Sequence, residues 1–378
     1  MKTNKLLFLG MAVLSLVFTN CDSKEEATKE SEFTFGNVVS RDFKGKIVDI
    51  NNNPIANATI SLNGYEVTTN SSGIFSYVNA NVKERFAYFT AKKEGYLDGS
   101  RLVMSHEGLN ELTIMMLPMD VTATIPTGVV SEVTLPNTTK VTFDGSFMLE
   151  NGTAYNGDVK VIVNHLDAAD PKVFDKMPGN LIGEREDGSI SGMETYGMIN
   201  VELRGDDNQK LQITTGHTAN ISLPIAANQL DTAPSTIPLW HFNETSGMWE
   251  ENGFARRIGG KYVGNVSHFS WWNCDYAYPV ATLNVFVTNA DGTPVQGVRV
   301  TISRQAGSTG DVLMDLGITG ANGSLSAGVP RNEVLTFRAY NVNGVLINTQ
   351  QLPASNLAVR NVYVVIPFND RVAAPSKN

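Results

Sequence analysis

The side chains best suited to chemistry lie in one stretch of the sequence. His241, His268, Cys274 and Asp275 are residue types that bind zinc, and Cys274 with His268 has the composition of a catalytic dyad. The chain lacks the HExxH motif and paired CxxC spacing, and no residue is identifiable that would orient the histidine or form an oxyanion hole. We therefore predict hydrogen-bonded histidines in a packed sheet, no catalytic residue, no bound metal and no cofactor.

The other cysteine, Cys21, has a different setting. Lys2 and Lys5 precede an apolar stretch over residues 6–18, which is the pattern of an export signal. This stretch is too short to span a bilayer, because a membrane-spanning helix needs roughly 20 apolar residues. No Ala-x-Ala cleavage site lies between residues 18 and 26, so the cysteine stands where a secreted soluble protein would have small residues.

The tetrapeptide Phe18-Thr19-Asn20-Cys21 resembles the lipobox of bacterial lipoproteins. In that family the cysteine becomes the mature N-terminus and carries acyl chains such as palmitate on its sulfur and amine. The resemblance implies a signal peptide at residues 1–20, lipidation of Cys21 and a membrane as partner, since each buried methylene contributes about 0.8 kcal/mol. The alternative is an uncleaved signal whose cysteine is incidental.

Residues 21–40 are predicted to form a disordered acidic tether. Seven of the eleven residues from 22 to 32 are charged, and such a segment cannot bury enough apolar surface to fold. The sequence Ser23-Lys24-Glu25-Glu26 also resembles the acidic signal that directs lipoproteins of the Bacteroidota to the outer face of their outer membrane. That resemblance implies a lipid-anchored protein of the cell outer membrane that faces the exterior, with the inner face as the alternative.

Charge and composition argue against one class of partner. The chain has 378 residues, a formal net charge of −9 and no concentrated basic face, which argues against nucleic-acid binding. Its length suggests two or three domains, and 42% hydrophobic residues are enough to form their cores. Because Cys21 is expected to be lipidated, Cys274 has no cysteine left to pair with, and no disulfide is predicted.

Short strands separated by turn residues predict an all-β chain, with tandem antiparallel β-sandwich domains behind the signal peptide and the tether. Residues 41–118 contain seven such strands, with NNNP, NG and NSSG among the turns. This segment resembles the carboxypeptidase regulatory-like, or transthyretin-like, domain. The resemblance implies a structural or binding spacer and no peptidase activity. It rests on Gly45, Asp49, Pro54, Ile55, Ala58, Ile60, Thr69, Gly73 and Phe75.

The same spacing returns 240 residues later, which predicts a second sandwich at residues 280–368, followed by a tail at 369–378. Asn52 and Asn57 stand where the family has glycine, and asparagine tolerates the left-handed backbone that such turns need. The second copy has glycine at both positions. The apolar residues that repeat are Pro54, Ile55, Ala58, Ile60 and Leu62, matched by Pro294, Val295, Val298, Val300 and Ile302.

Residues 119–279 are predicted to form a β-rich middle domain that contains all four tryptophans. A long loop from Asp167 to Gly192 interrupts its strands, and long loops often carry function. The stretch from Leu239 to Asp275 resembles a W-x-F-N-x-x-x-G-x-W pattern followed by S-H-F-S-x-W-N-x-D. This block recurs in surface lipoproteins of the Bacteroidota and, more loosely, in animal extracellular matrix proteins of the cartilage intermediate layer type. The resemblance implies no particular activity.

Two interpretations of the tryptophans stay open. Aromatic side chains bury large areas, so Trp240, Trp249 and Trp272 are expected in a core. Alternatively, Trp249 or Trp271 is exposed and binds sugar rings by stacking. Adjacent residues of a regular strand face opposite sides, so Trp271 and Trp272 cannot both point into one core. At least one of these two must face a neighbouring domain, a ligand or water.

One further motif concerns modification. Asp231-Thr232-Ala233 resembles the O-glycosylation triplet of the Bacteroidota and lies in a proline-rich stretch. The resemblance implies a sugar on Thr232.

Together these patterns predict a non-enzymatic, surface-exposed outer-membrane lipoprotein that acts as a binding or structural and adhesion module at the cell envelope. Its partner would be a glycan or an envelope or extracellular protein. One alternative is a glycan-binding accessory lipoprotein for nutrient capture, which would use the tryptophans. The other is a hydrolase or metal-binding protein that uses the middle domain, with the long loop and His165, His241 and His268.

Overall fold

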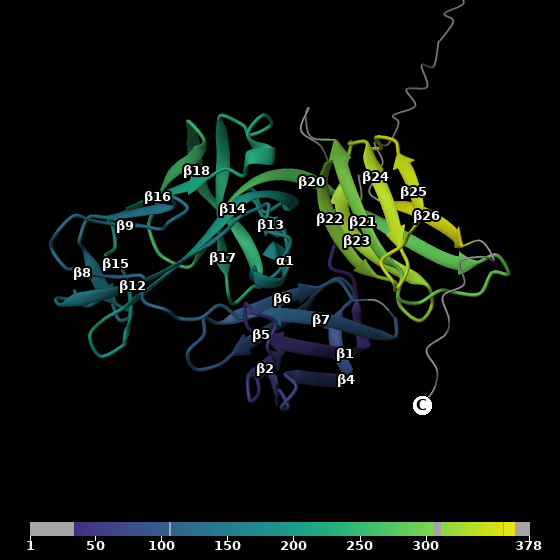
Figure 1. The fold of residues 1–378 in the computed structure, drawn as a ribbon, viewed down its shortest axis with the longest axis horizontal. Coiled ribbons are helices and arrows are strands. Elements are labelled where there is room, and N and C mark those ends of the chain that lie inside the picture. Colours follow the sequence, from purple (N-terminus) through teal and green to yellow (C-terminus); the bar gives the residue numbers. More distant parts are fainter. Residues whose placement is uncertain (1–33, 106, 306–310, 358, 367–378) are drawn as a thin grey trace, which may run out of the picture. The chain divides into compact units, whose positions relative to one another are not determined.

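The structure is a computed structural model, and it describes residues 34–105, 107–305, 311–357 and 359–366. Strands make up most of this part of the chain (Figure 1), which confirms the prediction of an all-β protein with tandem sandwiches. The predicted signal peptide, Cys21, most of the tether and the predicted tail lie outside the described residues. Within the described ranges, no helix is long and apolar enough to cross a membrane.

The first sandwich consists of two sheets, with the strand orders β4-β1-β7 and β3-β2-β5-β6. All seven predicted strands are present, and the first of them begins at Val38, three residues before the predicted start of the domain at residue 41. Phe43, Ile60 and Phe89 are fully buried in the core of this unit. The strands are β1 (Val38–Val48), β2 (Thr59–Leu62), β3 (Tyr65–Thr68), β4 (Ile74–Lys83), β5 (Ala87–Lys92), β6 (Gly99–Val103) and β7 (Leu109–Met115).

The local sequence explains these elements. In β2 the side chains alternate between buried and half-buried, as expected for a strand with one face in the core. Asn52 and Asn57 have φ angles of 65° and 54°, so both asparagines occupy the left-handed turn positions predicted for them. The substitution of asparagine for the family's glycine is therefore compatible with the fold.

One strand pair of the first sandwich differs from the prediction of purely antiparallel sheets. β1 pairs in parallel with β7 over seven residue pairs, from Asp42 opposite Leu109 to Val48 opposite Met115. Alternation of apolar and polar residues determines which face of a strand is buried. It does not determine the direction of the neighbouring strand, so the parallel pairing of β1 with β7 could not be predicted from the sequence pattern.

The last unit repeats this topology strand for strand. Its sheets have the orders β23-β20-β26 and β22-β21-β24-β25, and β26 pairs in parallel with β20 as β7 does with β1. Leu283, Val300 and Phe337 lie in its core. The strands are the second half of β20 (Trp271–Asn289), then β21 (Arg299–Gln305), β22 (Asp311–Ile318), β23 (Ser324–Pro330), β24 (Leu335–Tyr340), β25 (Leu346–Leu352) and β26 (Val359–Ile366).

A buried threonine makes the same hydrogen bonds in both copies. Thr69 Oγ1 donates to the carbonyl of Ile55 at 2.7 Å and accepts from the amide of Ala58 at 2.9 Å. Thr319 makes the two equivalent bonds in the other copy, at 2.7 and 3.1 Å. The internal repeat predicted from the sequence is therefore confirmed, down to individual hydrogen bonds.

The middle unit is built on a sheet with the order β11-β15-β14-β20-β17-β18-β19-β16-β10-β9, to which β8, β12 and β13 add further pairings. Its strands confirm the β-rich character predicted for this part of the chain. The elements are β8 (Ala123–Pro126), β9 (Ser131–Thr134), β10 (Lys140–Phe143), β11 (Phe147–Leu149), β12 (Asp158–Leu166), α1 (Val173–Lys176), β13 (Ile182–Glu184), β14 (Ile190–Arg204), β15 (Lys210–Ile213), β16 (Ala219–Pro224), a 3-10 turn (Ala227–Gln229), β17 (Thr236–Asn243), β18 (Met248–Ile258) and β19 (Lys261–Val266).

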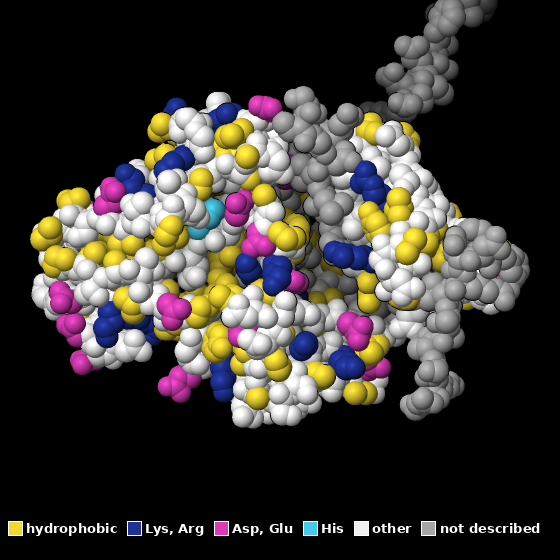
Figure 2. Space-filling view, in the orientation of Figure 1, with side chains coloured by type: hydrophobic (Ala, Val, Ile, Leu, Met, Phe, Trp, Pro, Cys, Tyr) yellow, Lys and Arg dark blue, Asp and Glu magenta, His cyan; other side chains and the backbone are white. Residues whose placement is uncertain are grey.

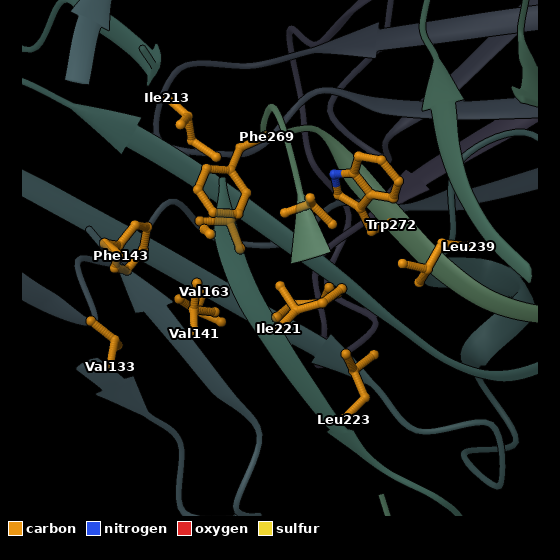
Figure 3. Packing of buried hydrophobic residues seen from close by; sticks show 14 of the residues in the cluster. Val133, Val141, Phe143, Val163, Ile213, Ile221, Leu223, Leu239, Phe269 and Trp272 are labelled. Carbon is orange, nitrogen blue, oxygen red and sulfur yellow. The ribbon is translucent and has the colours of Figure 1, made fainter. Parts of the chain in front are cut away.

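Apolar side chains from several strands of the middle unit meet in one core. Figure 3 shows Phe143, Val163, Ile221, Phe269 and Trp272 pointing toward one another from strands and loops that are far apart in the sequence. The largest of these side chains, Trp272, comes from β20. This strand therefore contributes to more than one core, because its second half belongs to the last sandwich.

β20 joins the middle unit to the last sandwich without a break. Its first half pairs with β14 and β17, and its second half, from Val280, pairs with β23 and β26. The predicted domain boundary between residues 279 and 280 falls inside this 19-residue strand. The connection is therefore hydrogen-bonded backbone rather than a linker.

The loop predicted from Asp167 to Gly192 is largely ordered into short elements. It contains α1 and β13, and β14 already begins at Ile190. β13 pairs with β14 and, in parallel, with β18. The prediction of one long loop was wrong because the prolines and glycines that suggested it only separate these short elements.

Candidate functional site

All four tryptophans are buried. Trp240 and Trp249 have no exposed surface, and Trp272 and Trp271 are 1% and 4% exposed. The interpretation of Trp240, Trp249 and Trp272 as core residues is confirmed. The alternative, in which Trp249 or Trp271 is exposed, is wrong, because stacking on a sugar requires an open aromatic face.

Trp271 and Trp272 lie in different cores. Trp272 packs in the core of the middle unit, where its Nε1 donates to the carbonyl of His268 at 2.9 Å. Trp271 packs in a second core, in which Leu97 and Leu117 of the first sandwich take part. The prediction that the two side chains point to different surroundings is confirmed, and those of Trp271 include a neighbouring domain. The second core also contains Leu166, Val173, Met177, Leu181, Met193, Met198, Trp240, Phe242 and Trp249.

Hydrogen bonds extend this contact between the first sandwich and the middle unit. The amide of Leu102 in β6 donates to the carbonyl of Gly179 at 3.1 Å, and the amide of Gly179 donates to Ser100 Oγ at 3.1 Å. The hydroxyl of Tyr88 donates to the carbonyl of Glu244 at 3.1 Å. The segment between α1 and β13 thus covers β6, an edge strand whose outer backbone N–H and C=O groups would otherwise lack a partner strand.

His241 and His268 lie beside Trp272. The ring centroids of the two histidines are 4.7 Å apart, and Nε2 of His241 lies 3.5 Å from Oε2 of Glu250. Burial lowers the pKa of His268 to about 4, with a contribution from His241, and burial also lowers the pKa of His241. Both imidazoles are therefore neutral near pH 7. Across the described ranges, no group of three or more His, Cys, Asp or Glu side chains is placed to hold a metal ion.

His165 and Cys274 have other surroundings. Nδ1 of His165 lies 2.8 Å from the side-chain amide nitrogen of Asn137. Cys274 is fully buried in the core of the middle unit, and burial raises the pKa of its thiol. A nucleophilic cysteine needs a lowered pKa and access to substrate. Cys274 has neither and occupies the place of a packing residue.

Thr232 lies in the loop between the 3-10 turn and β17. Its side chain is half-buried, and its hydroxyl donates to the carbonyl of Gln229 at 3.2 Å. The predicted modification of Thr232 by a sugar stays a prediction.

A cavity of about 270 Å³ lies where side chains of all three units meet. β6 and β7 of the first sandwich line it together with α1, the segment before β13, and parts of β20, β22 and β23. Its volume is close to the lower end of the range of small-molecule sites.

On the face drawn in Figure 2, acidic and basic side chains are interspersed with hydrophobic ones rather than gathered into patches of one sign.

Arg101 is the basic side chain of the cavity lining. Its Nη2 donates to the carbonyl of Thr113 at 3.5 Å, which is the long limit of a hydrogen bond. Burial lowers the pKa of Arg101 to about 10, and the negative charge of Asp175 partly offsets this effect. Among the ion pairs of the described residues, none involves Arg101. Arg101 is therefore a half-buried cation at the cavity that makes no ion pair within 4.0 Å among the described residues, and Asp175 is the nearby negative charge.

Neither the role of Arg101 nor this cavity could be predicted from the sequence. The segment SRLVM predicts only a strand, and a charged residue at an alternate strand position ordinarily faces water. Residues between positions 101 and 328 line the cavity, so it forms only when separate units pack together. No local pattern carries that information.

No protein-family model matches the chain. Among curated proteins, human cartilage intermediate layer protein 2 is 30% identical over 118 residues, which are 30% of this chain and 10% of that protein. Human cartilage intermediate layer protein 1 is 30% identical over 108 residues, which are 29% of this chain and 9% of that protein. The chain thus spans about a tenth of the length of the curated relatives it matches. The tryptophan-rich stretch from Leu239 to Asp275 resembles proteins of this type.

Similar solved structures include two bacterial proteins. The TIE protein of Bacillus anthracis is 10% identical, with a TM-score of 0.19, over 87% of this chain and 50% of that chain. The major pilin subunit BcpA of Bacillus cereus is 9% identical, with a TM-score of 0.18, over 87% of this chain and 99% of that chain. TM-scores this low do not indicate a shared fold.

Proposed function

We propose that the chain is a non-enzymatic, lipid-anchored module of the outer-membrane surface with a structural or adhesive role. The anchor and the outward-facing location are inferred from the lipobox-like sequence at Cys21 and the acidic signal that follows it. The glycan-binding alternative has lost its support, because Trp249 and Trp271, on which it depended, are buried.

The observation that best supports a structural role is the pairing of the first strand with the last strand in each sandwich. In both copies this pair is parallel, with seven residue pairs between β1 and β7 and eight between β20 and β26. When a sandwich is pulled from its two ends, a parallel pair is loaded along the strands. Its hydrogen bonds must then break together rather than one after another, because they are evenly spaced along the ladder. This arrangement suits a module that transmits force between a tether and a bound partner.

Single-molecule pulling on the full, unlipidated chain tests this role. One handle is attached at Cys21 and the other at an introduced cysteine, either Asp120→Cys beyond the end of β7 or Leu109→Cys at its start. Both positions are exposed. The first geometry shears the β1–β7 ladder and the second unzips it, so we expect a several-fold higher unfolding force in the first. Equal forces in the two geometries would contradict the load-bearing role.

The anchor is tested with Cys21→Ala in the full-length protein expressed in a bacterium that processes lipoproteins. We expect the unchanged chain to fractionate with the outer membrane, to carry acyl mass on residue 21 and to be cut by protease added to whole cells. The Cys21→Ala variant should lose the acyl mass and the cleaved N-terminus. Cys274→Ala is the matched control, since it removes the other cysteine and should leave lipidation intact. An unmodified Cys21 in the unchanged protein would refute the anchor.

A further inference from the structure

We propose that the cavity between the three units binds a small monocarboxylate with an apolar body, and that Arg101 binds the carboxylate. This ligand site would add a specific binding activity to the structural role, and it does not depend on the lipid anchor. The inference rests on the Arg101 guanidinium, which makes no ion pair within 4.0 Å among the described residues, on the apolar lining of the same cavity and on its acidic side chains.

Arg101 has more capacity for hydrogen bonds than the protein uses. A guanidinium group carries five N–H donors in a planar fork that matches the geometry of a carboxylate. The bond to the carbonyl of Thr113, at 3.5 Å, occupies one of them weakly. Removing a cation from water without a partner is costly, and a bound anion would offset that cost. The burial that lowers the pKa of Arg101 is the same burial that would strengthen a bond to an anion.

The rest of the lining defines the ligand further. Met104, Phe174, Val280 and Leu325 contribute apolar surface from three different units, which suits an alkyl or aryl body. Asp175 and Glu111 line the same cavity. These two carboxylates outnumber the one cation of the lining, so each negative charge that Arg101 does not bind directly weakens binding of the ligand. A monocarboxylate therefore fits better than a dicarboxylate or a phosphate.

Calorimetric titration of the full chain tests the proposal, with hexanoate as the probe. Adipate, which has a second carboxylate, and hexanamide, which is neutral, serve as comparison ligands. We expect hexanoate to bind, and both comparison ligands to bind at least about tenfold more weakly, since a charge-assisted bidentate bond is lost or opposed. Hexanoate affinity should fall by a similar factor in Arg101→Met, which keeps an unbranched apolar stem but removes the guanidinium group. Arg101→Lys should retain part of the affinity.

The melting temperature separates binding from a structural role of Arg101. Because its charge has no ion-pair partner, Arg101→Met should melt at or above the temperature of the unchanged protein, whereas a structural arginine would lower it. Val280→Phe fills the cavity from the last sandwich with Arg101 intact, and it should also abolish hexanoate binding. The proposal fails if the folded, unchanged chain does not bind hexanoate, or if folded Arg101→Met or Val280→Phe binds it with unchanged affinity.

Discussion

Replacing Trp271 by Ala is expected to lower the free energy of unfolding by about 3–5 kcal/mol, as much as the same replacement of Trp272. The two side chains are 4% and 1% exposed, and they fill different cores. Each replacement therefore removes a large apolar side chain and leaves a cavity whose walls relax only in part. Denaturant unfolding followed by circular dichroism, which does not depend on tryptophan fluorescence, measures both changes.

The informative comparison is between Trp271 and an aromatic residue that is truly exposed. Tyr65 in β3 is 76% exposed, so Tyr65→Ala should change the free energy of unfolding by less than about 1 kcal/mol. If Trp271→Ala behaved like Tyr65→Ala rather than like Trp272→Ala, the side chain would be open to solvent. The contact through Leu97 and Leu117 with the first sandwich would then be absent in solution.

Turn chemistry and apolar alternation were enough to predict the two outer sandwiches. Turns such as those at Asn52 and Asn57 require a left-handed backbone, and only a few residue types supply it at low cost. The same requirement recurs in the second copy, where Gly292 and Gly297 have φ angles of 84° and 83°. Because these positions depend on local backbone geometry, a single sequence reveals them. The parallel β1–β7 pair is a non-local feature, and the sequence pattern did not distinguish it.

The candidate site could not be predicted in the same way. Whether Trp271 lies in a core or on a surface depends on what packs on that face of β20. The core that contains Trp271 also contains Leu97 and Leu117, which are more than 150 positions earlier in the chain. The continuity of β20 across the predicted boundary has a related cause. A period-2 pattern continues unchanged when a strand passes from one sheet to the next, so the sequence contains no signal for the change of partner.

Gly323→Ala is expected to lower the free energy of unfolding by roughly 2–5 kcal/mol, and Gly73→Ala by a similar amount. Both glycines have a φ of 71°, which costs a residue with a Cβ about 1–2 kcal/mol. A Cβ at Gly323 would also lie 2.4 Å from the carbonyl oxygen of Val287, and one at Gly73 would lie 2.5 Å from that of Ile47. These carbonyls each accept a backbone hydrogen bond at 3.0 Å, so moving them away weakens the turn on which the repeat is built.

Two glycines in the same sandwiches separate the clash from the backbone strain. Gly64 and Gly344 have φ angles of 83° and 76°, and a Cβ at either would meet no atom within 4 Å. Their replacement by Ala should therefore cost only the 1–2 kcal/mol or so of left-handed strain. Denaturant unfolding measures the free energy of unfolding of the four variants. We expect similar values for Gly73→Ala and Gly323→Ala, both lower than the values for Gly64→Ala and Gly344→Ala. If all four lost the same stability, the close approach to the Ile47 and Val287 carbonyls would not exist in solution. If Gly73→Ala and Gly323→Ala differed from each other, the two turns would not be equivalent parts of a repeat.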